Sequence, residues 1–132
     1  MQSFQLQEAW QRTISEEDKE RLFLLFEESK DHSAEAITCV PYRLAVNHRQ
    51  ELLCTVLIHN RSEESLDIRN VDISVYKNNL EIAHHSFHDL PLQLPSKTSM
   101  PWTYIFPLDR YHSSLTNEDK KSIIVSLSEH LR

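Results

Sequence analysis

The sequence predicts a mainly β protein, an antiparallel immunoglobulin-like β-sandwich with one amino-terminal helix packed on it. The chain starts with a helical pattern and then changes to the alternation of strands, with short apolar stretches at intervals of roughly ten residues. None of the 132 residues is glycine. Phosphate-binding loops, dinucleotide-binding turns and nucleophile elbows need glycine for positive φ or close backbone approach, so the sequence excludes these sites.

The composition is that of one folded, soluble domain, which we place over residues 1–132. Hydrophobic residues make up 39% and charged residues 26%, and 14 Lys and Arg against 20 Asp and Glu give a net charge of −6. Because no basic cluster is present, neither nucleic acid nor an anionic membrane is an expected partner. The chain shows no amino-terminal export signal and no apolar run that could span a bilayer, so we expect a cytoplasmic protein without membrane insertion.

The first element is a helix at about Glu16 to Ser29. Ser15 is suited to cap its amino terminus, with Asp18 three residues on in a capping-box position, and the acidic first turn favours the helix dipole. The apolar side chains of the helix form one stripe, which must cover a surface. This stripe comprises Leu22, Phe23, Leu25 and Phe26, with Trp10 and Ile14 upstream.

The β-sandwich is expected over about residues 36–128. Its first strand spans about Ile37 to Val46 and should be interrupted near Pro41, because proline suits only sheet edges and bulges. The second strand, Glu51 to Asn60, is apolar on both faces. This pattern predicts that the opposite sheet covers one face and the amino-terminal helix covers the other.

The middle of the chain contains a predicted hairpin. A change of parity near Asn70 indicates a bulge or a new strand. Asn78 and Asn79 then predict a type I′ turn, because asparagine tolerates positive φ best after glycine. The returning strand runs from about Leu80 to Phe87, and a proline-punctuated connection follows it.

The tail allows two interpretations. Alternate apolar residues fit a strand: Ile123, Val125 and Leu127. A helical spacing is also present: Ile124, Leu127 and Leu131. We favour a strand at about Lys121 to Ser128.

The richest aromatic row lies on the strand from about Met100 to Phe106. A place in the core is the ordinary explanation for such a row. If Trp102 or Tyr104 faces outward together with Pro101, the three residues form a docking patch for a peptide or for an added strand. Pro101, Trp102 and Tyr104 are therefore the candidate binding residues.

Three neighbouring histidines, His84, His85 and His88, are the candidate metal ligands, because imidazole is the commonest metal ligand. In a strand, however, adjacent side chains point to opposite faces, and His84 and His88 lie about 13 Å apart along one face. We therefore predict no metal site and no cofactor. His84 and His88 remain the candidates should a metal bind.

No catalytic constellation is visible in the sequence. His59 ends the central strand, and we interpret it as a strand-end residue at the solvent boundary, since no nucleophile can be placed beside it. Cys39 and Cys54 lie in apolar runs and are expected to be free, buried thiols. We predict that the protein is not an enzyme.

Some of these segments resemble the SLAP domain, named from the S-layer assembly protein of the accessory Sec system in Gram-positive spore formers. The resemblance spans about Trp10 to Phe106. It rests on Trp10 with the helix stripe, on Leu53 to Asn60 (LCTVLIHN), on Ala83 with Phe87, and on Pro101 to Phe106 (PWTYIF). The turns carry asparagine or charged residues where relatives often carry glycine.

The resemblance implies a noncatalytic accessory module linked to the export or assembly of surface-layer proteins through a second SecA ATPase, with no catalytic residues to transfer. We expect a protein-interaction module with a protein partner, accessory to secretion or to cell-envelope assembly. The alternative is a small-ligand or metal-binding β-sandwich domain that uses the His84–His88 region.

Overall fold

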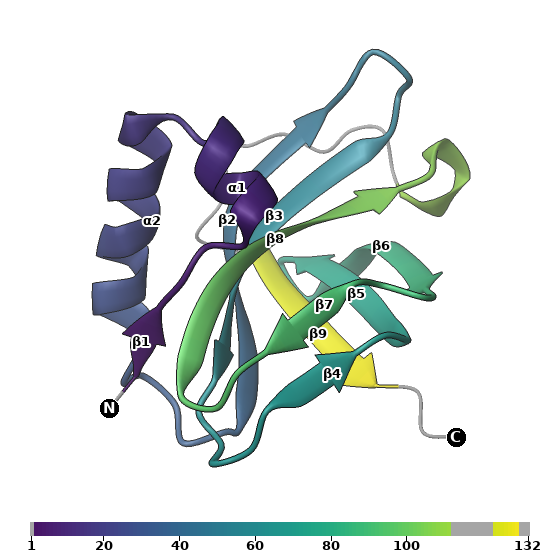
Figure 1. Ribbon diagram of the computed structural model, residues 1–132. Helices are drawn as coiled ribbons and strands as arrows, with labels where there is room; N and C mark the ends of the chain where they lie inside the picture. Colours follow the sequence, from purple (N-terminus) through teal and green to yellow (C-terminus); the bar gives the residue numbers. More distant parts are fainter. Residues whose placement is uncertain (1, 112–122, 130–132) are drawn as a thin grey trace.

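The structure is a computed structural model that describes residues 2–111 and 123–129, and it is mainly β, as predicted (Figure 1). Two helices, α1 (Glu8–Thr13) and α2 (Glu16–Ser29), precede most of the strands. The strands are β1 (Ser3–Phe4), β2 (Ile37–Val46), β3 (Leu52–Asn60), β4 (Leu66–Ile68), β5 (Val71–Lys77), β6 (Leu80–Phe87), β7 (Leu92–Leu94), β8 (Thr98–Phe106) and β9 (Ile123–Glu129), with a short 3₁₀ turn at Leu108–Arg110.

The described strands pair into three sheets. The largest has the order β1-β8-β3-β2, the second joins β4 to β7, and the third has the order β6-β5-β9. Within the described ranges, β1 and β8 run parallel and the other pairs are antiparallel. The central strands of the largest sheet are therefore β3 and β8. The two helices lie on one face of this sheet, and the two smaller sheets lie on the other (Figure 1).

One hydrophobic core lies between the four-stranded sheet and the two smaller sheets. Alternate residues of the central strands point into it, including Val56 and Ile58 of β3 and Phe106 of β8, each 0% exposed. They meet Ile73 of β5 and Leu92 of β7. Figure 1 shows these smaller sheets on one side of the large sheet and α2 on the other.

The opposite face of β3 is covered by α2. Leu22 and Phe26 of α2 are buried, and the Phe26 ring centroid lies 6.3 Å from that of His59. Leu57, on this side of β3, is also fully buried. The prediction that a sheet covers one face of β3 and a helix covers the other is confirmed.

Two predictions about the architecture need correction. Two helices, rather than one, precede the body of strands; the six-residue α1 has no side-chain cap, so its sequence signal is weak. The immunoglobulin-like sandwich is not confirmed, because the strands divide among three sheets and one pair is parallel rather than antiparallel.

Several local predictions are confirmed. Helix α2 has the predicted bounds, and the Ser15 hydroxyl accepts the Asp18 N–H at 3.0 Å. Asn78 and Asn79 have φ values of 53° and 68° and connect β5 to β6. The predicted interruption near Pro41 is wrong, because β2 continues through Pro41 at the edge of its sheet and carries a bulge between Pro41 and Arg43.

The parity change at Asn70 marks a new strand, since β4 and β5 pair with different partners. The tail forms the favoured strand, β9, within its described part; Lys121 and Leu131 lie outside the described residues. In the absence of glycine, side-chain-bearing residues adopt left-handed backbone at five described positions: Gln50, Asn78, Asn79, Asp89 and Lys97. Neither described helix has the length and apolar character needed to span a bilayer.

Candidate protein-docking groove

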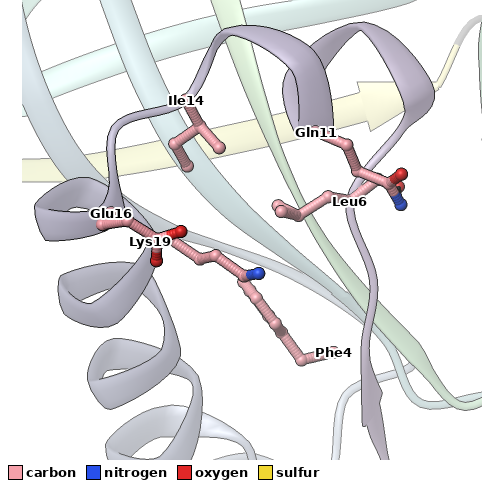
Figure 2. A pocket seen from close by; sticks show the side chains of 6 residues that line it. All are labelled: Phe4, Leu6, Gln11, Ile14, Glu16 and Lys19. Atoms are coloured by element: carbon pink, nitrogen blue, oxygen red, sulfur yellow. Dashed lines mark hydrogen bonds between the residues drawn. The ribbon is translucent and has the colours of Figure 1, made fainter.

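A groove runs along one flank of α2, between this helix and the amino-terminal segment that contains β1. It consists of two adjoining hollows of about 320 Å³ and about 450 Å³, which share Phe4, Glu16 and Lys19. The first is also lined by Leu6, Gln11 and Ile14, and the second by Glu20, Phe23 and Leu24. Figure 2 shows Leu6, Ile14 and Lys19 directed into the space between α2 and the segment that follows β1. We call this feature the α2–β1 groove.

Aromatic rings form the floor of the α2–β1 groove. The ring centroid of Phe4 lies 5.8 Å from that of Phe23 and 5.6 Å from that of Phe26, distances at which aromatic pairs attract each other. Phe26 is buried, whereas Phe23 is 45% exposed and its neighbour Leu24 is 61% exposed. Adjacent, half-exposed large apolar side chains beside a hollow are typical of a contact surface.

The rim of the groove is mainly acidic. Glu16 and Glu20 stand on the α2 side, with Lys19 as the basic side chain of the lining. Neither glutamate forms an ion pair with any residue in the ranges 2–111 and 123–129. Their charges are therefore available to a molecule that enters the groove.

Both ends of α2 are held on the large sheet by charged side chains. At the amino-terminal end, Arg43 and the Tyr42 hydroxyl donate to the Asp18 carboxylate at 2.6 and 2.7 Å. Both bonds lower the pKa of Asp18, and the bond from Arg43 has the larger effect. At the carboxyl-terminal end, Arg61 donates to the carbonyls of Ser29 and Lys30, where a cation complements the helix dipole.

A directed chain of hydrogen bonds links the amino-terminal segment to α2 through His59. The Ser29 hydroxyl donates to the Leu25 carbonyl, so it accepts from Nε2 of His59 at 2.8 Å. Nδ1 of His59 then accepts from the Ser99 hydroxyl, whose oxygen accepts from the Gln2 amide at 3.1 Å. For a neutral His59, this pattern places the proton on Nε2.

The environment of His59 agrees with that assignment. The side chain is 0% exposed. Burial, and to a smaller extent the charge of Arg61, lowers the pKa of His59 to about 4. The interpretation of His59 as a residue at the solvent boundary is wrong, because Ser29 and Ser99, far away in the sequence, enclose it.

Another hollow, of about 470 Å³, lies between α1, α2 and the large sheet. Trp10 is an apolar residue of its lining, and Asp18 and Arg43 are the charged ones. Its lining also includes Thr55 and Thr103, whose hydroxyls are 2.9 Å apart. Because Arg43 is already bonded to Asp18, this hollow offers a neutral rather than an anion-attracting surface.

The structure places the three candidate binding residues of β8 mostly inside the protein. Pro101 is buried, Tyr104 is 1% exposed, and Trp102 is half-buried and packs against the core. Tyr104 and Pro101 therefore lack the exposure that a docking patch requires. Tyr104 belongs to the hydrophobic core, and Pro101 is buried as well. Any binding by Trp102 stays a prediction.

The histidine cluster does not converge. His84 is exposed, while His85 lies half-buried on the other face of β6, with its ring 4.8 Å from that of Phe87. His88 contacts Asn70. No group of three His, Cys, Asp or Glu side chains suited to a metal occurs among the described residues. His84 instead lines a hollow of about 290 Å³ with Asp109 and Tyr111, and the small-ligand alternative for this region stays a prediction.

The two cysteines are free thiols, as predicted. Cys54 is fully buried and Cys39 is half-buried. Burial raises the pKa of both to about 12, so both carry their protons at neutral pH. Both side chains pack in or against the hydrophobic core.

The α2–β1 groove was not predicted from the sequence, although one signal for it is present. Residues Leu22 to Phe26 are five consecutive apolar residues. Successive residues turn by about 100° around a helix, so five in a row cannot all face one sheet. Phe23 and Leu24 are the two that remain exposed.

The protein is a mainly β module with exposed apolar side chains on its longer helix. The family model of the SLAP domain matches residues 4–127, nearly the whole chain. The chain therefore belongs to the SLAP domain family, as its sequence resemblance indicates. No curated protein and no solved structure matches it significantly.

Proposed function

We propose that the protein is a non-enzymatic interaction module that binds a protein partner in the α2–β1 groove. The observation that carries this proposal is the exposure of Phe23 and Leu24 beside Phe4 on a helix flank fixed by polar contacts. A surface of this kind, already formed before binding, loses little conformational entropy when a partner docks. Exposed apolar patches rimmed by polar groups mark interaction sites.

Membership in the SLAP family supports the cellular setting of the proposal. The module acts in the cytoplasm, as an accessory to protein secretion or to the assembly of envelope and S-layer proteins. This role needs contacts with other proteins and no catalytic group, in agreement with the protonated cysteines and the enclosed His59.

Site-specific cross-linking tests the proposal. A photoreactive phenylalanine analogue replaces Leu24, and in a matched control it replaces Leu80, which is 67% exposed on the β5–β6 hairpin. In the native cells, we expect a specific protein adduct from position 24 and none from position 80. The captured protein, once purified, should bind the unmodified module and lose roughly tenfold in affinity with Leu24→Ser. Adducts that are absent at position 24, or equal at both positions, would refute the proposal.

A further inference from the structure

We infer that the α2–β1 groove takes an extended segment in which an apolar run is flanked by lysine or arginine. This inference rests on the proposed docking function and adds the chemistry of the partner. Three features carry it: the aromatic floor, the acidic rim, whose glutamates have no ion-pair partner among the described residues, and the edge of β1.

The floor selects apolar side chains. Phe4 and Phe23 pack edge to face at an interplanar angle of 79°, and Leu24 extends the apolar surface outward. Covering these half-exposed side chains removes apolar area from water, which is the main favourable term in protein association. The hollow beside them, about 450 Å³, has room for a few aliphatic side chains.

The rim selects positive charge. Glu16 and Glu20 flank the floor without ion-pair partners in the described ranges, whereas Lys19 is the basic side chain between them. A second copy of the chain would bring the same glutamates against each other, and each copy carries a net charge of −6. Like charges at an interface are costly, so the rim disfavours a symmetric dimer and favours a basic partner.

The edge of β1 selects an extended backbone. The N–H groups of Ser3 and Gln5 donate to the carbonyls of Lys97 and Ser99. By the alternation of a parallel pair, the N–H and C=O of Phe4 point away from β8. No described strand pairs with this outer edge, since β1 ends the sheet order. A peptide strand added there places its alternate side chains beside the Phe4 ring.

The composition of the inferred ligand suits the proposed function. A basic stretch followed by an apolar stretch is the pattern of secretory signal segments. In a segment that has not yet folded, the backbone N–H and C=O groups are unpaired and can bond to an open strand edge.

Three labelled peptides test the inference by fluorescence anisotropy: Lys-Lys-Leu-Val-Leu-Val-Ser, the same apolar run behind Glu-Glu, and a Lys-Lys peptide with serine and threonine in place of the apolar run. We expect the basic apolar peptide to bind at least roughly tenfold more tightly than either of the others. Its affinity should fall as salt rises from about 50 mM to about 500 mM.

Variants locate the binding. Glu16→Gln with Glu20→Gln should weaken the basic apolar peptide roughly fivefold, and Leu24→Ser roughly tenfold. The matched controls are Glu28→Gln, an exposed carboxylate of α2 outside the groove lining, and Leu80→Ser on the distant hairpin. Both controls should leave the affinity unchanged. Amide chemical shifts in NMR spectra should move at Phe4 and Phe23.

Several results would overturn the inference: equal affinity for the acidic and basic apolar peptides, no effect of the double glutamine variant, shifts that map away from the groove, or no binding at about 1 mM peptide. These outcomes differ from a failure of the proposed function. A partner cross-linked at position 24 that ignores the charge of Glu16 and Glu20 would keep the docking function and reject a basic ligand.

Discussion

The two faces of the large sheet are covered in different ways. Toward the smaller sheets, β3 and β8 contribute an almost purely apolar layer, with Val56, Ile58 and Phe106 fully buried. Toward α2, the same strands contribute polar groups as well, and His59 and Ser99 are also 0% exposed. One face therefore depends on close packing, and the other depends on a directed set of hydrogen bonds.

This difference explains where a partner can bind. On the core face, the large apolar side chains of the central strands are buried, or half-buried in the case of Trp102, because a layer of strands covers them. The helix face is covered by α2 with the short α1 beside it (Figure 1). Because α2 is fixed on the sheet at discrete polar points, its flank stays open beside β1. Phe23 and Leu24 are exposed on that helix.

The largest expected difference between the two faces is a pH dependence of the unfolding free energy that comes from His59, on the helix side. Its folded pKa, about 4, lies below the ordinary value of 6.5. The neutral form therefore stabilises the fold fully above pH 6.5, and this contribution is lost as the pH falls from 6.5 toward 4. The loss amounts to about 3 kcal/mol of unfolding free energy. Urea unfolding at a series of pH values, compared with His59→Gln, measures it.

His85 supplies a control for this titration. Burial also lowers the pKa of His85, so His85→Gln should remove a smaller part of the pH dependence in the same direction. If the wild type and His59→Gln lose the same stability between pH 7 and pH 4, His59 is not held neutral as its hydrogen bonds indicate.

Ser99→Ala should have the next largest effect. It removes the hydroxyl that donates to Nδ1 of His59 and accepts from Gln2, leaving a buried ring nitrogen without its partner. We expect a loss of about 2 kcal/mol of unfolding free energy, measured in urea at pH 7. Ser126→Ala, an exposed serine of β9, should change it by less than about 0.5 kcal/mol. Equal effects of the two substitutions would show that the chain through His59 adds no stability.

Local signals explain which parts of this architecture the sequence predicts. Helix α2 was predicted to the residue because Ser15 and the acidic first turn act within a few residues of the helix start. The Asn78–Asn79 hairpin follows from the backbone angles that asparagine tolerates. Strand β3 follows from the alternation of its own side chains.

The parts that were missed depend on contacts between distant segments. Strand β1 has two residues and is defined by its pairing with β8, at the other end of the chain. The environment of His59 is set by Ser29 and Ser99, and no local pattern connects these residues. The groove needs both β1 and α2, so it could not be placed before the parallel pair was known.

The smallest expected change in unfolding free energy comes from replacing a tyrosine by phenylalanine on each face of the large sheet. The Tyr104 hydroxyl, on the core face, is the one side-chain N or O atom in the described residues that is buried without a hydrogen-bond partner. Burial accordingly raises the pKa of Tyr104. Tyr104→Phe removes a polar group that gains nothing from the fold, so we expect it to raise the unfolding free energy by about 1 kcal/mol.

Tyr42→Phe is the matched control. The Tyr42 hydroxyl donates to Asp18 at 2.7 Å and helps to hold α2 on the sheet. Its removal should lower the unfolding free energy by about 1 kcal/mol in the same urea titration. A tyrosine hydroxyl is thus expected to destabilise the fold on the core side of the sheet, at Tyr104, and to stabilise it on the helix side, at Tyr42. If both tyrosine substitutions change the stability in the same direction, the division into a packing-dependent face and a hydrogen-bonded face is wrong.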